Sequence, residues 1–284
     1  MPTQALATAP DARAIGTAVD WPKGEFLGTW RVVTLLGRGG AAEVWHAVTA
    51  DGREAAVKLV KRELRRHPAA NTLIVHEHDV LRRVASSRLI EPFELIDCDG
   101  IAALGLEYMP HGDLVSMLGT SPRQWLPAFR AVVEGLADLE RHGFAHGDLK
   151  PRNVLFAADG RARLADLAAA RPLDAPAVVA TAAYGLPRSA GTAREADRFA
   201  LAAVLFELLT GRLPFGPRGA ADADAELPPV RLEDADAAPL LAAAVAALRA
   251  RGRVEGLSYF SDVIESVRSN YGISRLGTES PTTR

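Results

Sequence analysis

The chain has 284 residues, of which 48% are hydrophobic, and this is enough for one globular domain with a full core and short tails. Its 33 basic and 35 acidic residues nearly balance, so the total charge gives no indication of nucleic-acid binding. The single cysteine, Cys98, excludes an internal disulfide and a cysteine-based metal cluster.

The two ends of the chain have the composition of tails. Residues 1–27 contain Asp11 and Arg13 but no basic start followed by an apolar core, so they predict a disordered leader rather than a secretion signal. The polar residues 271–284 predict a flexible tail. Since no uninterrupted apolar run reaches about 18 residues, we expect no membrane span and a cytoplasmic location. The frequent use of Ala, Arg and Gly is typical of a GC-rich, bacterial genome.

The first element of the expected domain is rich in glycine. Residues 35–48 read LLGRGGAAEVWHAV, with Gly37 and Gly39 ahead of Val44. Glycine lets backbone amides approach a phosphate because no side chain stands in the way. Glycine-rich hairpins are common, so this pattern alone does not identify a phosphate-binding loop. It becomes specific only together with the segments that follow it.

A strand and a helix are expected next. Residues 54–60 read EAAVKLV, and their apolar, partly β-branched character between turn-like residues predicts a strand that carries Lys58. Residues 71–85 then have helical spacing, with Glu77, Leu81 and Val84 on one face. Glu77 is the charged candidate of this helix, and His76 and Asp79 lie close by as alternatives one or two positions away. Each element therefore brings one charged candidate residue.

The most informative stretch is residues 144–156, which read FAHGDLKPRNVLF. Asp148, Lys150 and Asn153 supply a carboxylate, an ammonium group and an amide within a few positions. Phosphoryl transfer from a metal nucleotide needs these groups, because a carboxylate accepts the proton of the attacking hydroxyl, an ammonium offsets phosphate charge, and an amide oxygen helps to hold a metal ion.

The rest of the chain predicts one hairpin and several helices. Asp159 and Gly160 have the residue types of a hairpin turn. We expect a helix within residues 195–215 and two shorter helices at about 237–251 and 258–269, after a loop rich in Pro, Gly, Ala and Asp.

Together, in this order, the segments resemble eukaryotic-like (Hanks-type) serine/threonine protein kinases from about Gly28 to Phe215. The corresponding family motifs are the glycine-rich loop G-x-G-x-x-G-x-V, V-A-I-K, H-R-D-L-K-x-x-N and D-F-G. The resemblance implies an α+β fold in which a β-rich N-lobe with one helix (about 28–107) is followed by a mostly helical, trimmed C-lobe (about 110–270).

The resemblance also implies ATP as the nucleotide, magnesium as the metal, with manganese as the alternative, and roles for individual residues. Asp148 and Lys150 would be catalytic, and Asn153 and Asp166 would bind the metal. Lys58, held by Glu77, would anchor the α- and β-phosphates. The residues expected to bind the nucleotide are Gly37, Gly39, Val44, Ala56, Lys58, Glu77, Leu106 as gatekeeper, Glu107 and Met109 through their backbone groups, and Leu155.

Several positions depart from the family pattern. Gly147 replaces the arginine that reads a phosphate on the activation segment of many such kinases. We therefore predict activity without phosphorylation of Thr181 or Tyr184, the candidate acceptors in that segment. Ala168 replaces the glycine of D-F-G, which restricts backbone flipping. Arg188 replaces the glutamate of A-P-E, so the surface that docks the substrate is expected to differ.

Three functions fit these residues. The leading one is a Ser/Thr protein kinase, because Lys150 follows Asp148 by two positions as in those enzymes; its protein substrate is not readable from the sequence, and its control is expected to come from a protein partner. The alternatives are a small-molecule kinase, since His146-Gly147-Asp148 also resembles the loop of aminoglycoside and choline kinases, and a nucleotide-binding pseudokinase scaffold.

Overall fold

The computed structural model describes residue 24 and residues 26–64, 68–98, 100–187, 191–220 and 226–273. Its contacts divide the chain into two compact units, and each is described here by itself. The first unit comprises residues up to Arg82 together with Glu91–Tyr108, and the second comprises Arg83–Ile90 together with the chain from Met109 onward.

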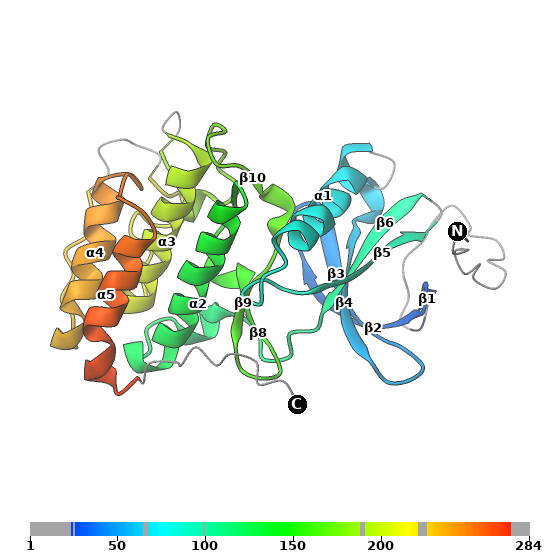
Figure 1. Ribbon diagram of the computed structural model, residues 1–284, viewed down its shortest axis with the longest axis horizontal. Coiled ribbons are helices and arrows are strands. Elements are labelled where there is room, and N and C mark those ends of the chain that lie inside the picture. The colour runs from blue at the N-terminus through cyan, green and yellow to red at the C-terminus, as the bar shows by residue number, and fades with distance from the viewer. Residues whose placement is uncertain are drawn as a thin grey trace. The chain divides into compact units, whose positions relative to one another are not determined.

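The first unit is an antiparallel sheet of six strands with one long helix (Figure 1). The strands run in the order β1-β2-β3-β4-β6-β5. Their bounds are Phe26–Leu27 (β1), Trp30–Arg38 (β2), Ala42–Val48 (β3), Glu54–Val60 (β4), Pro92–Cys98 (β5) and Ile101–Glu107 (β6), and the helix α1 is Pro68–Val84. The strand expected over 54–60 is confirmed as β4. Phe26 and Leu27 were assigned to the leader from the sequence, but they form β1, because the buried Leu27 packs into the core of the sheet.

The two faces of this sheet have different roles. Leu27, Trp30, Val57 and Leu59 belong to the apolar core on one face. Neighbouring residues along a strand point to opposite faces, so Lys58 lies on the other face. The register β3–β4–β6 therefore decides which side chains share the face that carries the charged candidate.

The second unit is mainly helical. Its helices are α2 (Pro122–Arg141), α3 (Ala193–Thr210), α4 (Ala238–Arg249) and α5 (Ser258–Arg268). Two small sheets pair β7 (Phe144–Ala145) with β10 (Arg171–Pro172) and β8 (Val154–Phe156) with β9 (Ala162–Leu164). Short 3₁₀ turns include η2 (Leu114–Met117), η3 (Pro151–Asn153), η4 (Leu167–Ala169), η5 (Ala182–Tyr184), η6 (Ala235–Ala237) and η7 (Ser269–Tyr271). The expected hairpin and the two late helices are confirmed.

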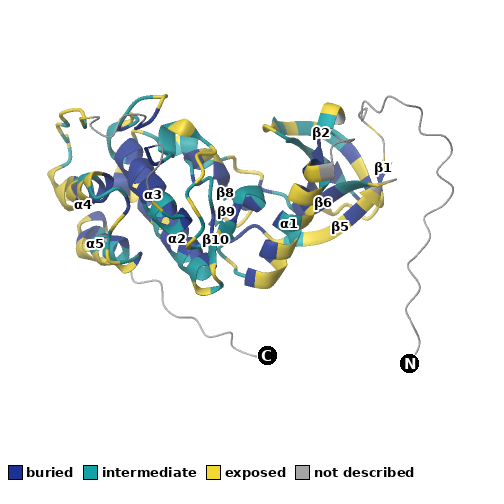
Figure 2. Cartoon of the chain, turned by 90° about the horizontal axis from the view of Figure 1, so that it is seen from above, coloured by how far each residue is buried: buried dark blue, intermediate teal, exposed yellow. Residues whose placement is uncertain are grey.

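Helix α3 is the most deeply buried helix of this unit, as the dark blue ribbon in Figure 2 indicates. It begins with a capping box, in which the Thr192 side chain accepts from the Glu195 amide and the Glu195 side chain accepts from the Thr192 amide. It ends at Gly211 in the left-handed conformation, as is usual for helix C-termini. These signals fix the start of the helix, and with it the position of Asp197 in the first turns.

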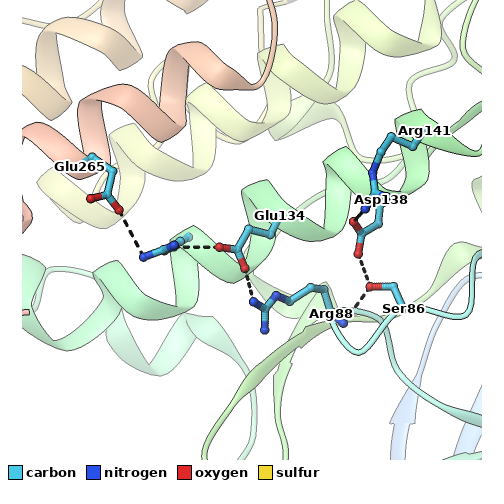
Figure 3. A network of polar contacts seen from close by, with 7 residues as sticks. Ser86, Arg88, Glu134, Asp138, Arg141 and Glu265 are labelled. Carbon is cyan, nitrogen blue, oxygen red and sulfur yellow. Dashed lines mark hydrogen bonds and ion pairs between the residues drawn. The ribbon is translucent and has the colours of Figure 1, made fainter. Parts of the chain in front are cut away.

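The segment between α1 and β5 belongs to the second unit because polar contacts tie it to α2 (Figure 3). Ser86 donates a hydrogen bond to Asp138, and Arg88 forms an ion pair with Glu134. Arg130 bridges Glu134 to α5, where it contacts Glu265 at 3.3 Å. The sequence had assigned residues 83–90 to the N-lobe, because such long-range contacts leave no local pattern in the chain.

Candidate active site

A buried ion pair organises the first unit. The Lys58 ammonium on β4 donates to Oε2 of Glu77 on α1 at 2.5 Å, and the exposed fractions of the two side chains are 8% and 0%. Asp79, two residues further along α1, is exposed. The rotation of α1 thus brings Glu77 rather than Asp79 to the lysine. Full burial of Glu77 requires a compensating cation, and Lys58 provides it.

The other expected nucleotide-binding residues of the first unit lie in register beside Lys58. Val44 on β3 pairs with Lys58, and Ala56 pairs with Leu106 on β6. Directly paired residues share a face of a sheet, and so do residues two apart along a strand. The structure therefore gathers Val44, Ala56, Lys58 and Leu106 on one face, opposite the apolar core.

The glycine-rich segment closes the hairpin between β2 and β3. Gly37 pairs with Val44, and the Gly39 amide donates to the carbonyl of Ala42 at 2.8 Å. A Cβ atom on Gly37 would meet no atom within 4 Å. At Gly39, by contrast, a Cβ atom would lie 3.6 Å from the Ala42 carbonyl oxygen.

The residues expected to meet the adenine belong to both units, and each is described within its own unit. The Glu107 amide donates to the carbonyl of Glu91 at 2.9 Å, so this amide is engaged within the first unit. Met109 is buried in the second unit, and Leu155 lies half-buried on β8 of the same unit. The adenine contacts expected for these residues stay predictions.

The second unit brings together the catalytic candidates. The Lys150 ammonium lies 2.6 Å from Oδ2 of Asp148 and donates to Oγ1 of Thr181 at 3.0 Å. The Thr181 hydroxyl in turn donates to Oδ1 of Asp148 at 2.6 Å. Both carboxylate oxygens of Asp148 are therefore held in place. Sequence reasoning treated Thr181 only as a phosphorylation candidate and missed this contact.

A buried aspartate on α3 holds the backbone of the same loop. The amides of His146 and Gly147 donate to the Asp197 carboxylate at 2.6 and 2.9 Å, so Asp197 holds the backbone of this loop. Burial raises the pKa of Asp197, while the charge of His146 and the two amide hydrogen bonds act in the opposite direction. The His146 ring is itself buried and bonds the Ala165 carbonyl through Nε2 at 3.1 Å, so it packs the loop.

The absence of a side chain at position 147 is required by the backbone. Gly147 has a φ of +82°, and a Cβ atom there would lie 2.4 Å from the carbonyl oxygen of Ala169. An L-residue could occupy this position only after the segment 167–169 moved. The packing of this loop therefore requires glycine at position 147. Compared with the family's arginine, Gly147 removes a positive charge and also permits this backbone conformation.

Asn153 and Asp166 carry oxygen atoms suited to a hard divalent cation. The Asn153 amide nitrogen donates to the Asp148 carbonyl at 2.8 Å, which leaves its amide oxygen as a ligand atom. The Ala165 amide donates to the Asn153 carbonyl at 2.9 Å and so ties Asn153 to the residue that precedes Asp166. Asp166 has a left-handed backbone with φ 65° and ψ 65°. The donor set fits magnesium, although no cluster of three or more His, Cys, Asp or Glu residues occurs in the described chain.

A second buried polar pair anchors the segment after Thr181. The Tyr184 hydroxyl donates to Oε2 of Glu207 on α3 at 2.6 Å. Burial raises the pKa of Glu207, and the hydrogen bond from Tyr184 acts in the opposite direction. Sequence reasoning missed this pair as well, since a tyrosine and a helical glutamate far apart in the chain give no joint signal. Arg188, the residue at the family's A-P-E glutamate, lies outside the described residues.

In the described part of the chain, every helix is too short or too polar to cross a membrane.

Comparisons with known proteins agree with this geometry. The family described as protein kinase domain matches residues 30–233. CBL-interacting protein kinase 4 of Oryza sativa subsp. japonica is 31% identical over 215 residues, which cover 69% of this chain and 47% of the relative. The probable serine/threonine-protein kinase PkwA of Thermomonospora curvata is 33% identical over 205 residues, or 66% of this chain and 27% of the relative. Serine/threonine-protein kinase pkn2 of Myxococcus xanthus is 29% identical over 210 residues, or 67% and 25%. The chain spans less than half the length of these relatives.

Proposed function

Because the chain belongs to the protein kinase domain family, we propose that it transfers the γ-phosphoryl group of ATP to a serine or threonine hydroxyl of a protein substrate. The observation that carries this proposal is the contact of Asp148, Lys150 and Thr181. A carboxylate held by an ammonium and a hydroxyl is pre-oriented toward an acceptor, and pre-orientation supplies most of the acceleration in phosphoryl transfer.

In this mechanism Asp148 orients the substrate hydroxyl and accepts its proton as the hydroxyl oxygen bonds to the γ-phosphorus. The bond to the leaving ADP oxygen breaks, and Lys150 offsets the charge on the phosphoryl oxygens. Lys58, whose position Glu77 fixes, anchors the phosphates of the nucleotide. Thr181 keeps Asp148 and Lys150 in a single arrangement, so it acts as a positioning residue.

Asn153 and Asp166 would hold magnesium, which when bound neutralises part of the phosphate charge. The hydrogen bond from Asn153 to the Asp148 carbonyl couples the metal ligand to the catalytic loop. Buried Asp197 also stabilises this loop, because its carboxylate accepts hydrogen bonds from the amides of His146 and Gly147. Manganese offers the same coordination chemistry and remains the alternative metal.

We further propose that transfer does not depend on phosphorylation of the activation segment. Gly147 provides no cation that could read a phosphate. Thr181 and Tyr184 already donate their hydroxyl groups to Asp148 and Glu207. A phosphate on either residue would bring negative charge against a carboxylate and separate the pair.

The test is incubation of the purified protein with labelled ATP and magnesium, with generic protein substrates, beside an Asp148→Ala variant. Asp159→Ala is the matched control, because Asp159 lies exposed in the β8–β9 turn. Label on Ser or Thr that disappears only with Asp148→Ala supports the proposal. Nucleotide binding without label transfer would instead favour the scaffold alternative.

A further inference from the structure

Among the charged side chains around Asp148, the acidic ones have partners within the protein, whereas one basic side chain has none among the described residues. The carboxylates near the catalytic loop already have partners: Asp148 is bound by Lys150 and Thr181, Asp197 by two backbone amides, and Glu207 by Tyr184. Asp197 and Glu207 are also buried, with exposed fractions of 5% and 8%. A basic side chain of a substrate would thus meet no available carboxylate among these three residues.

The same loop also carries a basic residue, Arg152, whose side chain has no partner among the described residues. Arg152 lies in η3, between Lys150 and Asn153, and both of these residues contact Asp148. The Arg152 side chain is exposed, and within the described residues no hydrogen bond, ion pair or ring contact engages it. A guanidinium that the protein itself does not neutralise is available for an anion from outside.

The position of Arg152 relative to the acceptor site follows from its two neighbours in the loop. A small hollow of the second unit is lined by Asp148, Thr181 and Tyr184, together with Val178. Lys150, two residues before Arg152, contacts both Asp148 and Thr181 of this lining, and Asn153, the next residue, donates to the Asp148 carbonyl. Arg152 therefore belongs to the loop segment that borders the hollow lined by the proposed catalytic carboxylate.

We propose that Arg152 selects acceptor sites in acidic segments, in which an Asp or Glu lies within a few residues of the Ser or Thr. This inference rests on the proposed function and deepens it. A few residues of extended chain span about 10 Å, so an Asp or Glu this close to the acceptor stays near the loop that carries Asp148 and Arg152. Since Arg152 stays solvated, the selection acts through ionic attraction and is weakened by salt.

The experiment uses two peptides that are identical except for the residues flanking one serine, which are Glu in one peptide and Lys in the other. The measured quantity is the ratio of kcat/KM for the two peptides, so a general loss of activity in a variant cancels. The variants are Arg152→Glu and Arg152→Gln. The matched control is Arg123→Glu, because Arg123 is also exposed, in the first turn of α2, with no partner among the described residues.

The wild-type ratio should favour the Glu peptide by about 5- to 20-fold at low salt, since each exposed charge pair alters binding by up to about 5-fold and attraction replaces repulsion. Arg152→Gln should bring the ratio close to one, Arg152→Glu should reverse it, and Arg123→Glu should leave it unchanged. High salt should reduce the wild-type ratio.

Transfer to both peptides without a charge preference, or a preference that Arg152→Glu leaves unchanged, would overturn this inference and leave the proposed function intact. Transfer to neither peptide nor to generic proteins would contradict the proposed function, and this inference would fall with it. If Arg152→Glu folds poorly, Arg152→Gln provides the same comparison without a charge reversal, and a wild type without any preference overturns the inference by itself.

Discussion

The hydroxyl of Thr181 donates a 2.6 Å hydrogen bond to Oδ1 of Asp148, so a residue of the activation segment helps to hold the proposed catalytic base. Lys150 joins the same contact from the other side, with its ammonium 3.0 Å from the Thr181 oxygen. The hydroxyl therefore has a structural role that does not require phosphorylation. Variants at position 181 must therefore separate the loss of the hydroxyl from the loss of a phosphorylation site.

The first prediction concerns the hydroxyl of Thr181. Thr181→Ser should keep most activity because it keeps the hydroxyl, whereas Thr181→Ala should lower kcat about 10-fold or more through loss of a hydrogen bond to a charged group. Thr181→Glu should be less active still, because a second carboxylate would face Asp148. Steady-state kinetics with phosphatase-treated protein measure this series. An inactive Thr181→Ser would contradict the role of the hydroxyl, and an active Thr181→Glu would instead indicate regulation by a phosphate.

The second prediction concerns the buried pair of Lys58 and Glu77. Lys58→Met or Glu77→Leu alone should lower the free energy of unfolding by about 3–5 kcal/mol, because each leaves a buried charge without its main partner. The double variant should recover much of this loss, since two apolar side chains then fill the site. Urea unfolding measures the stabilities. Full stability in either single variant would show that the pair carries little net energy.

Activity separates the role of this pair in function from its role in stability. All three variants should lose most phosphoryl transfer, including the stable double variant, because the phosphates lose their anchoring ammonium. A thermal-shift assay with ATP should show weaker nucleotide binding wherever Lys58 is replaced. Normal kcat in the double variant would contradict the role proposed for Lys58.

The sequence could predict elements whose causes are local. The strand Glu54–Val60 followed from its apolar, partly β-branched character, and the β8–β9 turn followed from Asp159 and Gly160. Helices α4 and α5 lie close to the bounds expected for the two late helices. The residue types at Asp148, Lys150 and Asn153 also predicted a loop for phosphoryl transfer, and the roles of these residues stay predictions. What it could not give depends on contacts between distant segments, such as the anchoring of the Ser86–Arg88 segment to α2.

Two residues show this limit within the candidate site. Thr181 carries no local signal for its contact with Asp148, since the two residues meet only after the activation segment folds back onto the loop. Gly147 was interpreted as a lost arginine, because the left-handed backbone and the nearby Ala169 carbonyl are properties of the fold. In both cases the sequence shows which residue stands at the position, but the contact that explains it is seen only in the folded structure.

The third prediction concerns pH and the buried Glu207. Burial raises its pKa above the ordinary value of 4.5, so the folded protein holds this proton more strongly than the unfolded chain does. Glu207 therefore contributes stability that is fully present below the unfolded pKa and is lost as pH rises through the folded pKa. Glu207→Gln should remove this contribution to the decrease of stability with rising pH. Its amide oxygen can still accept the hydrogen bond from Tyr184.

Melting temperatures between about pH 5 and pH 8 measure this effect. The wild type should lose more stability over this range than Glu207→Gln does. The matched control is Glu255→Gln, because Glu255 is exposed and should leave the slope unchanged. Asp197 is also buried with a raised pKa, so some slope should remain in every variant. Equal slopes in the wild type and Glu207→Gln would mean that Glu207 titrates normally in the folded protein.

The fourth prediction concerns Gly147, whose amide donates to Asp197 while its Cα faces the Ala169 carbonyl. Gly147→Ala should lower the free energy of unfolding by more than the roughly 1–2 kcal/mol that the left-handed conformation alone costs an L-residue. The excess arises because the new Cβ would lie 2.4 Å from the Ala169 oxygen. Gly147→Arg should cost at least as much, so restoring the family's residue should impair this chain.

Gly160→Ala provides the matched control for backbone strain. Gly160 also has a positive φ, of +76°, but a Cβ atom there would meet nothing within 4 Å. The difference in unfolding free energy between the two alanine variants therefore isolates the steric contact with Ala169. Activity should fall with Gly147→Ala and persist with Gly160→Ala, because only the former displaces the loop that carries Asp148. Equal destabilisation by both variants would mean that the segment around Ala169 yields readily, and an arginine at position 147 would then be compatible with this backbone.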